Sequence, residues 1–201
     1  MLEIKNLSLK KDNTILLKPT SLIFPPLSGL IGQSGEGKSV FIRTLALLEQ
    51  PFSGEILLNN KPLEKKDLGL ILQNFGLFSH LSVLKNLTLS LDLRKKDYKD
   101  VNTLVTSFKL THLLDKKPKQ LSGGEQQRVA IVRTLLLEPS VIFYDEPTAS
   151  LDYTYIETLT SYILSLKNKI QCIVSHDLHF LKSLNCPLFK LKNKNILPVE
   201  M

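Results

Sequence analysis

Residues 32–39 read Gly32-Gln33-Ser34-Gly35-Glu36-Gly37-Lys38-Ser39, and they fit the phosphate-binding pattern G-x-x-x-x-G-K-[ST] without a mismatch. A short, mostly apolar run of strand length, residues 27–31, comes directly before them. After them, apolar residues recur at helical spacings at Val40, Leu45 and Leu48. The order of strand, loop and helix is the context in which this pattern binds phosphate.

The composition of this loop has a physical explanation. Glycines allow the backbone to curl so that successive N–H groups point at phosphate oxygens, and the following helix directs its positive N-terminal end at the same charge. We expect Lys38 to reach the β and γ phosphates and the Ser39 hydroxyl to ligate Mg²⁺. A glycine-rich turn before a helix is the alternative, but such a match arises by chance in about one chain of this length in a hundred.

Length and composition indicate a globular chain. Its 201 residues, 43% of them hydrophobic, suffice for one sizeable core or one core plus a small subdomain. Apolar runs such as residues 141–144 are far shorter than the ~20 residues of a membrane-spanning helix, and no secretory leader is evident. Any work at a membrane is therefore expected to depend on a partner.

The cysteines bear on the cellular compartment, and the net charge bears on the binding partners. Cys172 and Cys186 lie in no C-x-x-C pair, so buried reduced thiols are expected, which suits the cytoplasm. The net charge of +7 comes mainly from lysines interrupted by acidic residues. Solvated faces explain such clusters more often than a nucleic-acid groove, although anionic nucleotides or membrane headgroups could exploit the excess.

The periodicity predicts a mixed α/β chain. Residues 2–9 and 15–17 read as antiparallel strands, and residues 56–58 begin a further hairpin. The apolar run 68–72 ends at Gln73, after which residues 75–120 show only helical spacings. The remaining chain predicts helices and strands in alternation: a helix after residue 122, strand 141–144, helix 153–167, strand 170–174, and a short final helix and strand. Such alternation implies a parallel sheet covered on both faces, with functional residues at the strand ends.

Two acidic residues end one of these strands. Asp145 is placed to hold Mg²⁺, usually through water, and Glu146 can orient and polarise the water that attacks a γ-phosphate. The alternative, an acidic pair that only caps a strand, is disfavoured beside a phosphate loop.

A second glycine-rich stretch, residues 121–128, reads L-S-G-G-E-Q-Q-R. Ser122 with Glu125 three residues later forms a capping box. That pattern leaves Gly123 and Gly124 unexplained, because each glycine in a helix costs up to ~1 kcal/mol relative to alanine. Glycines here expose backbone N–H groups to a phosphate, so we interpret residues 122–125 as a second phosphate-binding surface.

Together these motifs resemble a known family. The phosphate loop, Gln73, L-S-G-G-E-Q-Q-R, V-I-F-Y-D-E-P-T at 141–148, S-L-D at 150–152 and V-S-H-D at 174–177 resemble, in this order, the ATP-binding cassette (ABC) ATPases. The resemblance implies an α/β fold, with a P-loop NTPase (RecA-like) core, an antiparallel β subdomain and an inserted helical subdomain. It implies a single domain over residues 1–201, divided into residues 1–73 (antiparallel subdomain and P-loop part of the core), 74–135 (helical subdomain) and 136–201 (rest of the core).

The resemblance also implies a head-to-tail homodimer that sandwiches two ATP molecules. Each ATP would touch the phosphate loop of one chain and Ser122, Gly123 and Gly124 of the other. Asp152 would cross the dimer interface. These residues are thus expected to bind nucleotide without belonging to the phosphate loop.

Catalytic roles follow from the same resemblance. Gln73 would sense Mg²⁺ and the attacking water, and Glu146 would act as the general base. His176 would contact the γ-phosphate, and Lys38 would hold the phosphates. The implied metal ligands are Ser39, Gln73 and Asp145.

Two positions depart from the family pattern. The family commonly has an adenine-stacking aromatic residue near positions 10–12, where this chain reads Lys10-Lys11-Asp12. Lys10 or Lys11 could lie over the base, or base affinity is weaker. Val40, still expected beside the nucleotide, stands where Thr often follows the serine, so one polar contact is lost.

The expected function is ATP hydrolysis that powers solute uptake. Residues 70–87 and 126–135 are most similar to importers of polar amino acids, and Phe75, Leu77 and Phe78 are expected either to dock the membrane subunits or to pack in the core. The implied partners are integral membrane permease subunits and a solute-binding protein, at the cytoplasmic side of the cell membrane, with no nucleic acid. The alternatives are the ATPase of a lipid or lipoprotein export complex, or a soluble ABC ATPase acting on nucleic acid or ribosomes.

Overall fold

The computed structural model describes residues 1–95, 97–98 and 101–199. An antiparallel sheet with the strand order β2-β1-β4-β5 consists of β1 (Leu2–Lys11), β2 (Thr14–Phe24), β4 (Ser53–Leu58) and β5 (Lys61–Pro62). A larger sheet with the order β10-β9-β3-β8-β7-β6 consists of β3 (Leu27–Ile31), β6 (Leu68–Ile71), β7 (Val141–Asp145), β8 (Ile170–Val174), β9 (Leu188–Lys192) and β10 (Asn195–Val199).

The larger sheet is parallel except at one edge. β3 pairs in parallel with both β8 and β9, and β8, β7 and β6 continue in the same direction. The predicted parallel sheet is therefore confirmed. The sequence predicts a single strand after the last helix, whereas the structure has two, because Asn193 and Lys194 (φ 51° and 65°) make a tight turn and return β10 antiparallel to β9.

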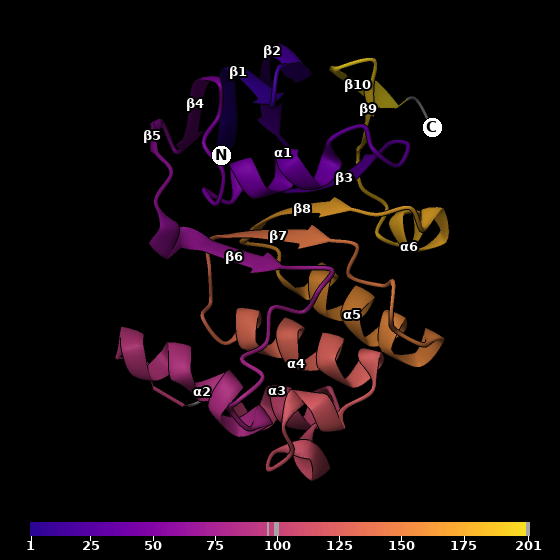
Figure 1. The fold of residues 1–201 in the computed structure, drawn as a ribbon. Helices are drawn as coiled ribbons and strands as arrows, with labels where there is room; N and C mark the ends of the chain where they lie inside the picture. The colour runs from indigo at the N-terminus through magenta and orange to yellow at the C-terminus, as the bar shows by residue number, and fades with distance from the viewer. Residues whose placement is uncertain (96, 99–100, 200–201) are drawn as a thin grey trace.

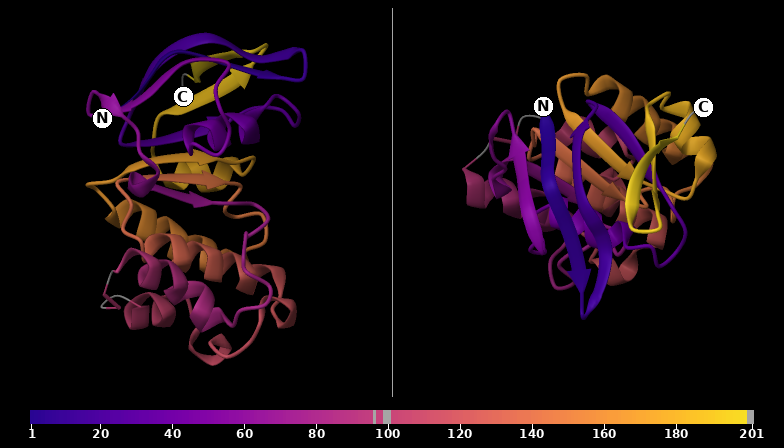
Figure 2. Two further views of the ribbon diagram at one scale, coloured as in Figure 1. Left: turned by 60° about the vertical axis from the view of Figure 1, so that its left-hand side comes forward. Right: turned by 90° about the horizontal axis from the view of Figure 1, so that it is seen from above.

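The helices lie on either side of the larger sheet (Figure 1). Their bounds are α1 (Lys38–Leu45), α2 (Val83–Arg94), α3 (Val101–Ser107), α4 (Gly123–Leu135), α5 (Tyr153–Ser165) and α6 (Leu178–Ser183). α1 and the antiparallel sheet cover one face, α4 and α5 cover the other, and α2 and α3 lie beyond α4 (Figures 1 and 2). The sheet is thus covered on both faces, but on one of them partly by strands.

Two apolar clusters explain why β7 reads as an unbroken apolar run. Val141 and Phe143 point to the cluster under the antiparallel sheet and α1, while Ile142 and Tyr144 point to the cluster among the helices. All four side chains are almost completely buried. Because alternate residues of a strand face opposite sides, a strand between two cores must be apolar at every position.

The segment between β6 and β7 is helical, as predicted, whereas α1 is shorter than predicted. Residues 72–140, where the structure describes them, form helices and turns with no strand, and α4 packs against both α2 and β6. α1 ends at Leu45, before Leu48, which the sequence analysis placed at a helical spacing; Leu47 is left-handed (φ 56°), and Leu48 is consequently exposed. The division of the chain at residues 73 and 135 stays a prediction.

Two smaller expectations concern cysteines and membrane spans. Cys172 and Cys186 are both free and buried, as predicted. Within the described ranges, no helix has the length and apolar character needed to cross a membrane.

Candidate nucleotide site

Most of the predicted site residues lie at the carboxyl ends of four neighbouring strands of the larger sheet. β3 leads into the phosphate loop, β8 is followed by His176, β7 ends in Asp145 before Glu146, and β6 is followed by Gln73. Parallel strands end at the same edge of a sheet, which is where open α/β sheets bind ligands. The topology therefore brings together residues that are far apart in the sequence.

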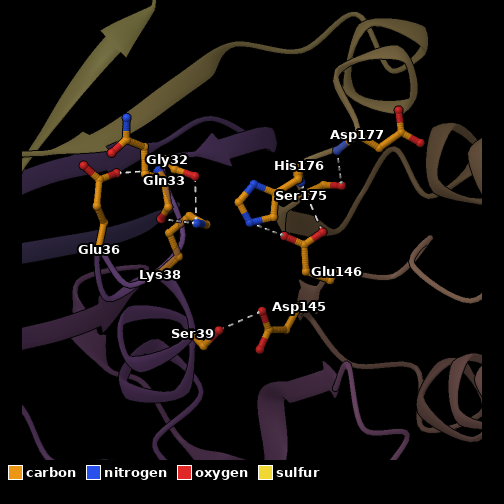
Figure 3. Close-up of polar contacts among 10 residues, drawn as sticks. All are labelled: Gly32, Gln33, Glu36, Lys38, Ser39, Asp145, Glu146, Ser175, His176 and Asp177. Carbon is orange, nitrogen blue, oxygen red and sulfur yellow. Dashed lines mark hydrogen bonds and ion pairs between the residues drawn. The ribbon is translucent and has the colours of Figure 1, made fainter.

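The phosphate loop is closed around its own lysine (Figure 3). Lys38 Nζ donates hydrogen bonds of 2.8 Å to the carbonyl oxygens of both Gly32 and Gln33. The Glu36 carboxylate accepts a 2.6 Å hydrogen bond from the Gln33 N–H. Gly37, left-handed at φ 94°, turns the chain into α1, a conformation that disfavours other residues. The loop is thus held in shape by its own side chains and backbone.

Lys38 is a buried cation facing negative groups. Its side chain lies against the loop, and the residue is only 6% exposed. Burial lowers the pKa of Lys38, and the carboxylates of Glu146, Glu36 and Asp145 oppose that effect. The position suits an anion that enters the loop, because such an anion would replace lost hydration of the ammonium group.

Ser39 and Asp145 meet below the loop. Ser39 Oγ donates a 3.4 Å hydrogen bond to Asp145 Oδ1, and Asp145 is 2% exposed. Burial raises the pKa of Asp145, while the Ser39 hydrogen bond and the charges of Arg43 and Lys38 oppose the shift. These contacts compensate the buried carboxylate only in part, so it favours a cation beside it.

The donor set at this point fits Mg²⁺. Ser39, Gln73 and Asp145 line one small cavity of about 140 Å³, which Arg43, Leu72 and Asn74 complete. Hydroxyl, amide and carboxylate oxygens are ligands that Mg²⁺ accepts, and this ion usually takes few of them from protein and the rest from water and phosphate. Consistent with such sparse ligation, the described part of the chain holds no cluster of three His, Cys, Asp or Glu side chains able to bind a metal.

Glu146 and His176 form a pair at the ends of β7 and β8. Glu146 is left-handed (φ 51°), and its N–H donates to the Val174 carbonyl at 2.9 Å. Its carboxylate Oε2 accepts from the His176 N–H at 3.1 Å, and His176 Nε2 lies 3.4 Å from Oε1. Oε1 is buried and makes no hydrogen bond to the residues that the structure describes. The carboxylate therefore has acceptor capacity left for a ligand or water.

These groups surround a cleft of about 670 Å³, a size typical of small-molecule sites. Nine predicted site residues line it: Ser34, Gly35, Gly37, Lys38, Ser39, Val40, Gln73, Glu146 and His176. Gly32, Gln33 and Glu36 instead shape the loop from behind, and Asp145 lies in the adjoining small cavity.

The sequence analysis missed other lining residues. Leu16, Thr148, Ala149, Val174 and Asp177 also line the cleft. All but Ala149 belong to a segment that the sequence analysis singled out: the 15–17 strand, the 141–148 strand motif or the 174–177 motif. Ala149 lies directly after the second of these segments. The packing of the two sheets determines which side chains of an apolar strand face the cleft. The sequence therefore indicated these lining residues only through the spacing of the motifs.

The two lysines at the end of β1 separate. Lys11 lines the cleft, whereas Lys10 Nζ lies over the Phe52 ring, 5.1 Å from its centroid. β1 changes register between Leu9 and Lys10, which redirects the side chains that follow. Of the two lysines that the sequence analysis left open, the structure brings Lys11 to the cleft.

Besides Gly32, Gln33 and Glu36, four further predicted nucleotide-binding residues do not line this cleft. Ser122 caps α4 and forms the predicted capping box with Glu125, with hydrogen bonds of 3.3 and 2.7 Å. Asp152 caps α5 by accepting from the Tyr155 N–H. Gly123 and Gly124 form the first turn of α4. Their contact with the nucleotide of a second chain stays a prediction.

The two glycines of α4 differ in their surroundings. A Cβ on Gly124 would lie 2.8 Å from the Ser150 carbonyl oxygen, so tight packing within the chain already requires glycine there. A Cβ on Gly123 would meet nothing closer than 3.8 Å. Packing within the chain therefore explains glycine at position 124, whereas no close contact in the described chain explains it at position 123. The contact of both glycines with a phosphate stays a prediction.

Comparisons with known proteins agree with this geometry. A sequence model described as ABC transporter matches residues 25–149. The "Probable sulfate/thiosulfate import ATP-binding protein CysA" of Chlorella vulgaris is 38% identical over 86% of this chain and 78% of its own length. The "Molybdate/tungstate import ATP-binding protein WtpC" of Methanocaldococcus jannaschii is 37% identical over 89% of this chain and 63% of its own length.

A solved structure matches over almost the whole chain. It is the dimeric structure of a post-hydrolysis state of the ATP-binding cassette MJ0796 bound to ADP and Pi. The TM-score is 0.88 at 28% identity, covering 98% of this chain and 96% of that one. The chain therefore belongs to the ABC transporter family and is an ATPase domain of that family.

Proposed function

We propose that this chain is the ATP-binding and ATP-hydrolysing subunit of an importer of a small solute. One observation carries the proposal: the loop lysine, Ser39 and the Glu146–His176 pair line one cleft at the ends of adjacent strands, and Asp145, hydrogen-bonded to Ser39, lines the cavity beside it. The two relatives compared above are named as import ATP-binding proteins, which favours uptake over export.

Within the cleft, the loop residues would bind the phosphates of ATP. Lys38 would exchange its bonds to Gly32 and Gln33 for phosphate oxygens, and the loop N–H groups and the N-terminus of α1 would add positive potential. Ser39, Gln73 and Asp145 would hold Mg²⁺, which, when bound, neutralises charge on the phosphates. The residues thus position the terminal phosphate before any bond breaks.

Glu146 would orient the attacking water and accept its proton. The free acceptor capacity of Oε1 supports this role, because a water in the cleft could donate to it. His176 would hold the carboxylate through its N–H and present its ring to the γ-phosphate. The positions of both residues depend on the register of β7 and β8, in which Asp145 pairs with Val174.

Ser122, Gly123, Gly124 and Asp152 would act on the nucleotide of a second chain. They lie away from the cleft of their own chain, and the structure of MJ0796 that resembles this one is dimeric. A head-to-tail homodimer would bring the open N-terminus of α4 to the partner's ATP. ATP binding would then close the dimer, and hydrolysis would reopen it.

The loop between Gln73 and α2 is the proposed contact with the membrane subunits. Phe78 is 44% exposed, Leu77 packs against the helical core, and Phe75 is half-buried. Of the three predicted docking residues, Phe78 is thus the one available to a partner. This contact would hold the chain at the cytoplasmic side of the membrane, with a solute-binding protein in the same system.

The names of relatives bear on the solute. They include sulfate, molybdate, spermidine with putrescine, and maltose with maltodextrin, and none of these is an amino acid. Import of a small solute is therefore the proposal. The predicted polar amino acid gains no support from these names.

Purification from gently solubilised membranes tests the proposal. The tagged chain is expected to bring with it an integral membrane protein and a solute-binding protein, whose ligand would identify the solute. Phe78→Ser should reduce this recovery, whereas Phe52→Ser, which alters a phenylalanine that is 65% exposed on the antiparallel sheet side, should not. Recovery with ribosomes or DNA and no membrane protein would contradict transport.

A further inference from the structure

The helix α4 contacts the segment that follows Glu146 at several of its turns. The segment, residues 147–155, connects β7 to the first turn of α5. Gln127 Nε2 donates a 3.2 Å hydrogen bond to the Pro147 carbonyl, and the Arg128 guanidinium carbon lies 3.7 Å from the centroid of the Tyr155 ring. The same helix presents Ser122–Gly124 at its N-terminus.

The Gln127 side chain binds the peptide directly after Glu146, where a shift of the backbone would move the Glu146 carboxylate. The residue is 1% exposed, and its amide reaches the peptide directly after Glu146. Glu146 itself has a left-handed backbone, a conformation that only surrounding contacts maintain. Because Pro147 has no N–H, its carbonyl is its only backbone hydrogen-bonding group, and Gln127 takes it.

Arg128 fixes the far end of the same segment. It is 6% exposed, its Nε has no hydrogen-bond partner in the described chain, and its guanidinium stacks on the Tyr155 ring. The Tyr155 N–H in turn donates to the Asp152 carboxylate. Two consecutive residues of α4 therefore contact both the residue after Glu146 and the first turn of α5.

We propose that Gln127 is a positioning residue for hydrolysis: it ties α4 to the peptide after Glu146, so that the N-terminus of α4 and the Glu146 carboxylate are placed together. The inference rests on the proposed function of Glu146. Gln126 provides a matched comparison, since its amide donates to the Leu121 carbonyl at the start of its own helix.

The test compares Gln127→Met with Gln126→Met. Methionine keeps the volume of glutamine and removes the amide donor. Turnover is measured at protein concentrations that saturate the rate, and ATP affinity is measured separately without Mg²⁺. We expect Gln127→Met to lose about tenfold in kcat, as for one hydrogen bond acting on the reaction, with ATP affinity within about twofold of wild type. Gln126→Met should retain both.

Several outcomes would overturn the inference. They are an unchanged kcat in Gln127→Met, equal losses in the two variants, or a loss confined to ATP affinity. If Gln127→Met does not fold, Tyr155→Leu is measured instead, because it removes the Arg128 stack at a half-buried site. We expect this variant to have about threefold lower kcat and unchanged ATP affinity. An unchanged kcat in Tyr155→Leu would overturn the inference. A wild-type chain without ATP turnover would overturn the proposed function and this inference together, whereas an active wild type with an equally active Gln127→Met would overturn the inference alone.

Discussion

His176 contacts the carboxylate of Glu146 twice, through its backbone N–H at 3.1 Å and through its ring Nε2, which lies 3.4 Å from the other oxygen. The first contact does not depend on the imidazole, because any residue except proline at position 176 supplies a backbone N–H. His176 lines the cleft, and its side chain is 55% exposed. The backbone thus orients the carboxylate, and the exposed ring stays available for the proposed contact with a nucleotide.

Glu146→Gln should bind ATP but hydrolyse it at least about a hundredfold more slowly. The amide oxygen can still accept the His176 N–H, so the local geometry should persist, while the proton acceptor is lost. Phosphate release and ATP-dependent dimer formation measure the two effects, and closed dimers should accumulate. Glu157→Gln, at an exposed carboxylate outside the cleft, is the control. Near-normal turnover in Glu146→Gln would contradict its assignment as general base.

Asp145→Asn should stabilise the metal-free chain while abolishing Mg²⁺-dependent turnover. Burial raises the pKa of Asp145, so the folded state binds its proton more tightly than the unfolded state, and stability falls as the pH rises through these values. The variant removes this loss. Its melting temperature at about pH 7 should increase by ~2–4 °C per kcal/mol recovered, and the gain should shrink as the pH falls through the raised pKa of Asp145 and vanish below about 4.

Thermal unfolding over a series of pH values measures this difference, with the exposed Asp115→Asn as control. A lower melting temperature for Asp145→Asn at neutral pH would show that the favourable interactions of the ionised Asp145 carboxylate outweigh the cost of its burial.

Gly123→Ala and Gly124→Ala should behave differently. Alanine has room at position 123 and favours a helix by up to ~1 kcal/mol, so this variant should be at least as stable as wild type. At position 124 the methyl group meets the Ser150 carbonyl, which should cost about 1–3 kcal/mol. Chemical denaturation measures both. If Gly123 faces a partner's phosphate, Gly123→Ala should nevertheless hydrolyse ATP more slowly; full activity would remove that role.

Lys11→Tyr should increase affinity for ATP. Lys11 lines the cleft, and no Phe, Tyr or Trp is among the described residues that line it, so a ring at this position could stack on the base and contribute roughly 1 kcal/mol, about fivefold in affinity. Lys10→Tyr is the matched control, since Lys10 is directed to Phe52. Nucleotide titration of the two variants checks the result. Equal affinities would place the base elsewhere in the cleft.

Asn86→Ala should destabilise the chain by about 3 kcal/mol. The fully buried Asn86 side chain accepts from the Phe78 N–H and donates to the carbonyls of Phe78, Leu81 and Ser82. Its loss leaves these groups without a partner side chain. Asn102→Ala, at an exposed position of α3, should change stability by less than about 0.5 kcal/mol in the same denaturation experiment. Similar losses in both variants would show that the loop satisfies these groups in another way.

The parts of the site that depend on local sequence could be predicted. The phosphate loop between β3 and α1 and the acidic residues at the end of β7 are confirmed in position, because a strand, a glycine-rich turn and a helix are encoded within a few residues. The capping box of α4 is likewise local. The roles of these residues in catalysis stay predictions.

Features that depend on contacts between distant segments could not be predicted. The choice between Lys10 and Lys11 depends on a register change in β1, and the need for glycine at position 124 depends on the backbone of Ser150. The terminal hairpin lacked its usual signal, since its turn has no glycine.

The placement of β8 between β3 and β7 affects when the nucleotide site can form during synthesis of the chain. Ile173 pairs with Gly29 on one side and with Tyr144 on the other. A growing chain that has emerged only as far as α5 holds the phosphate loop and Glu146 but lacks the strand that joins them. Such long-range pairing slows folding, so the nascent chain should acquire its nucleotide site only when its last quarter leaves the ribosome.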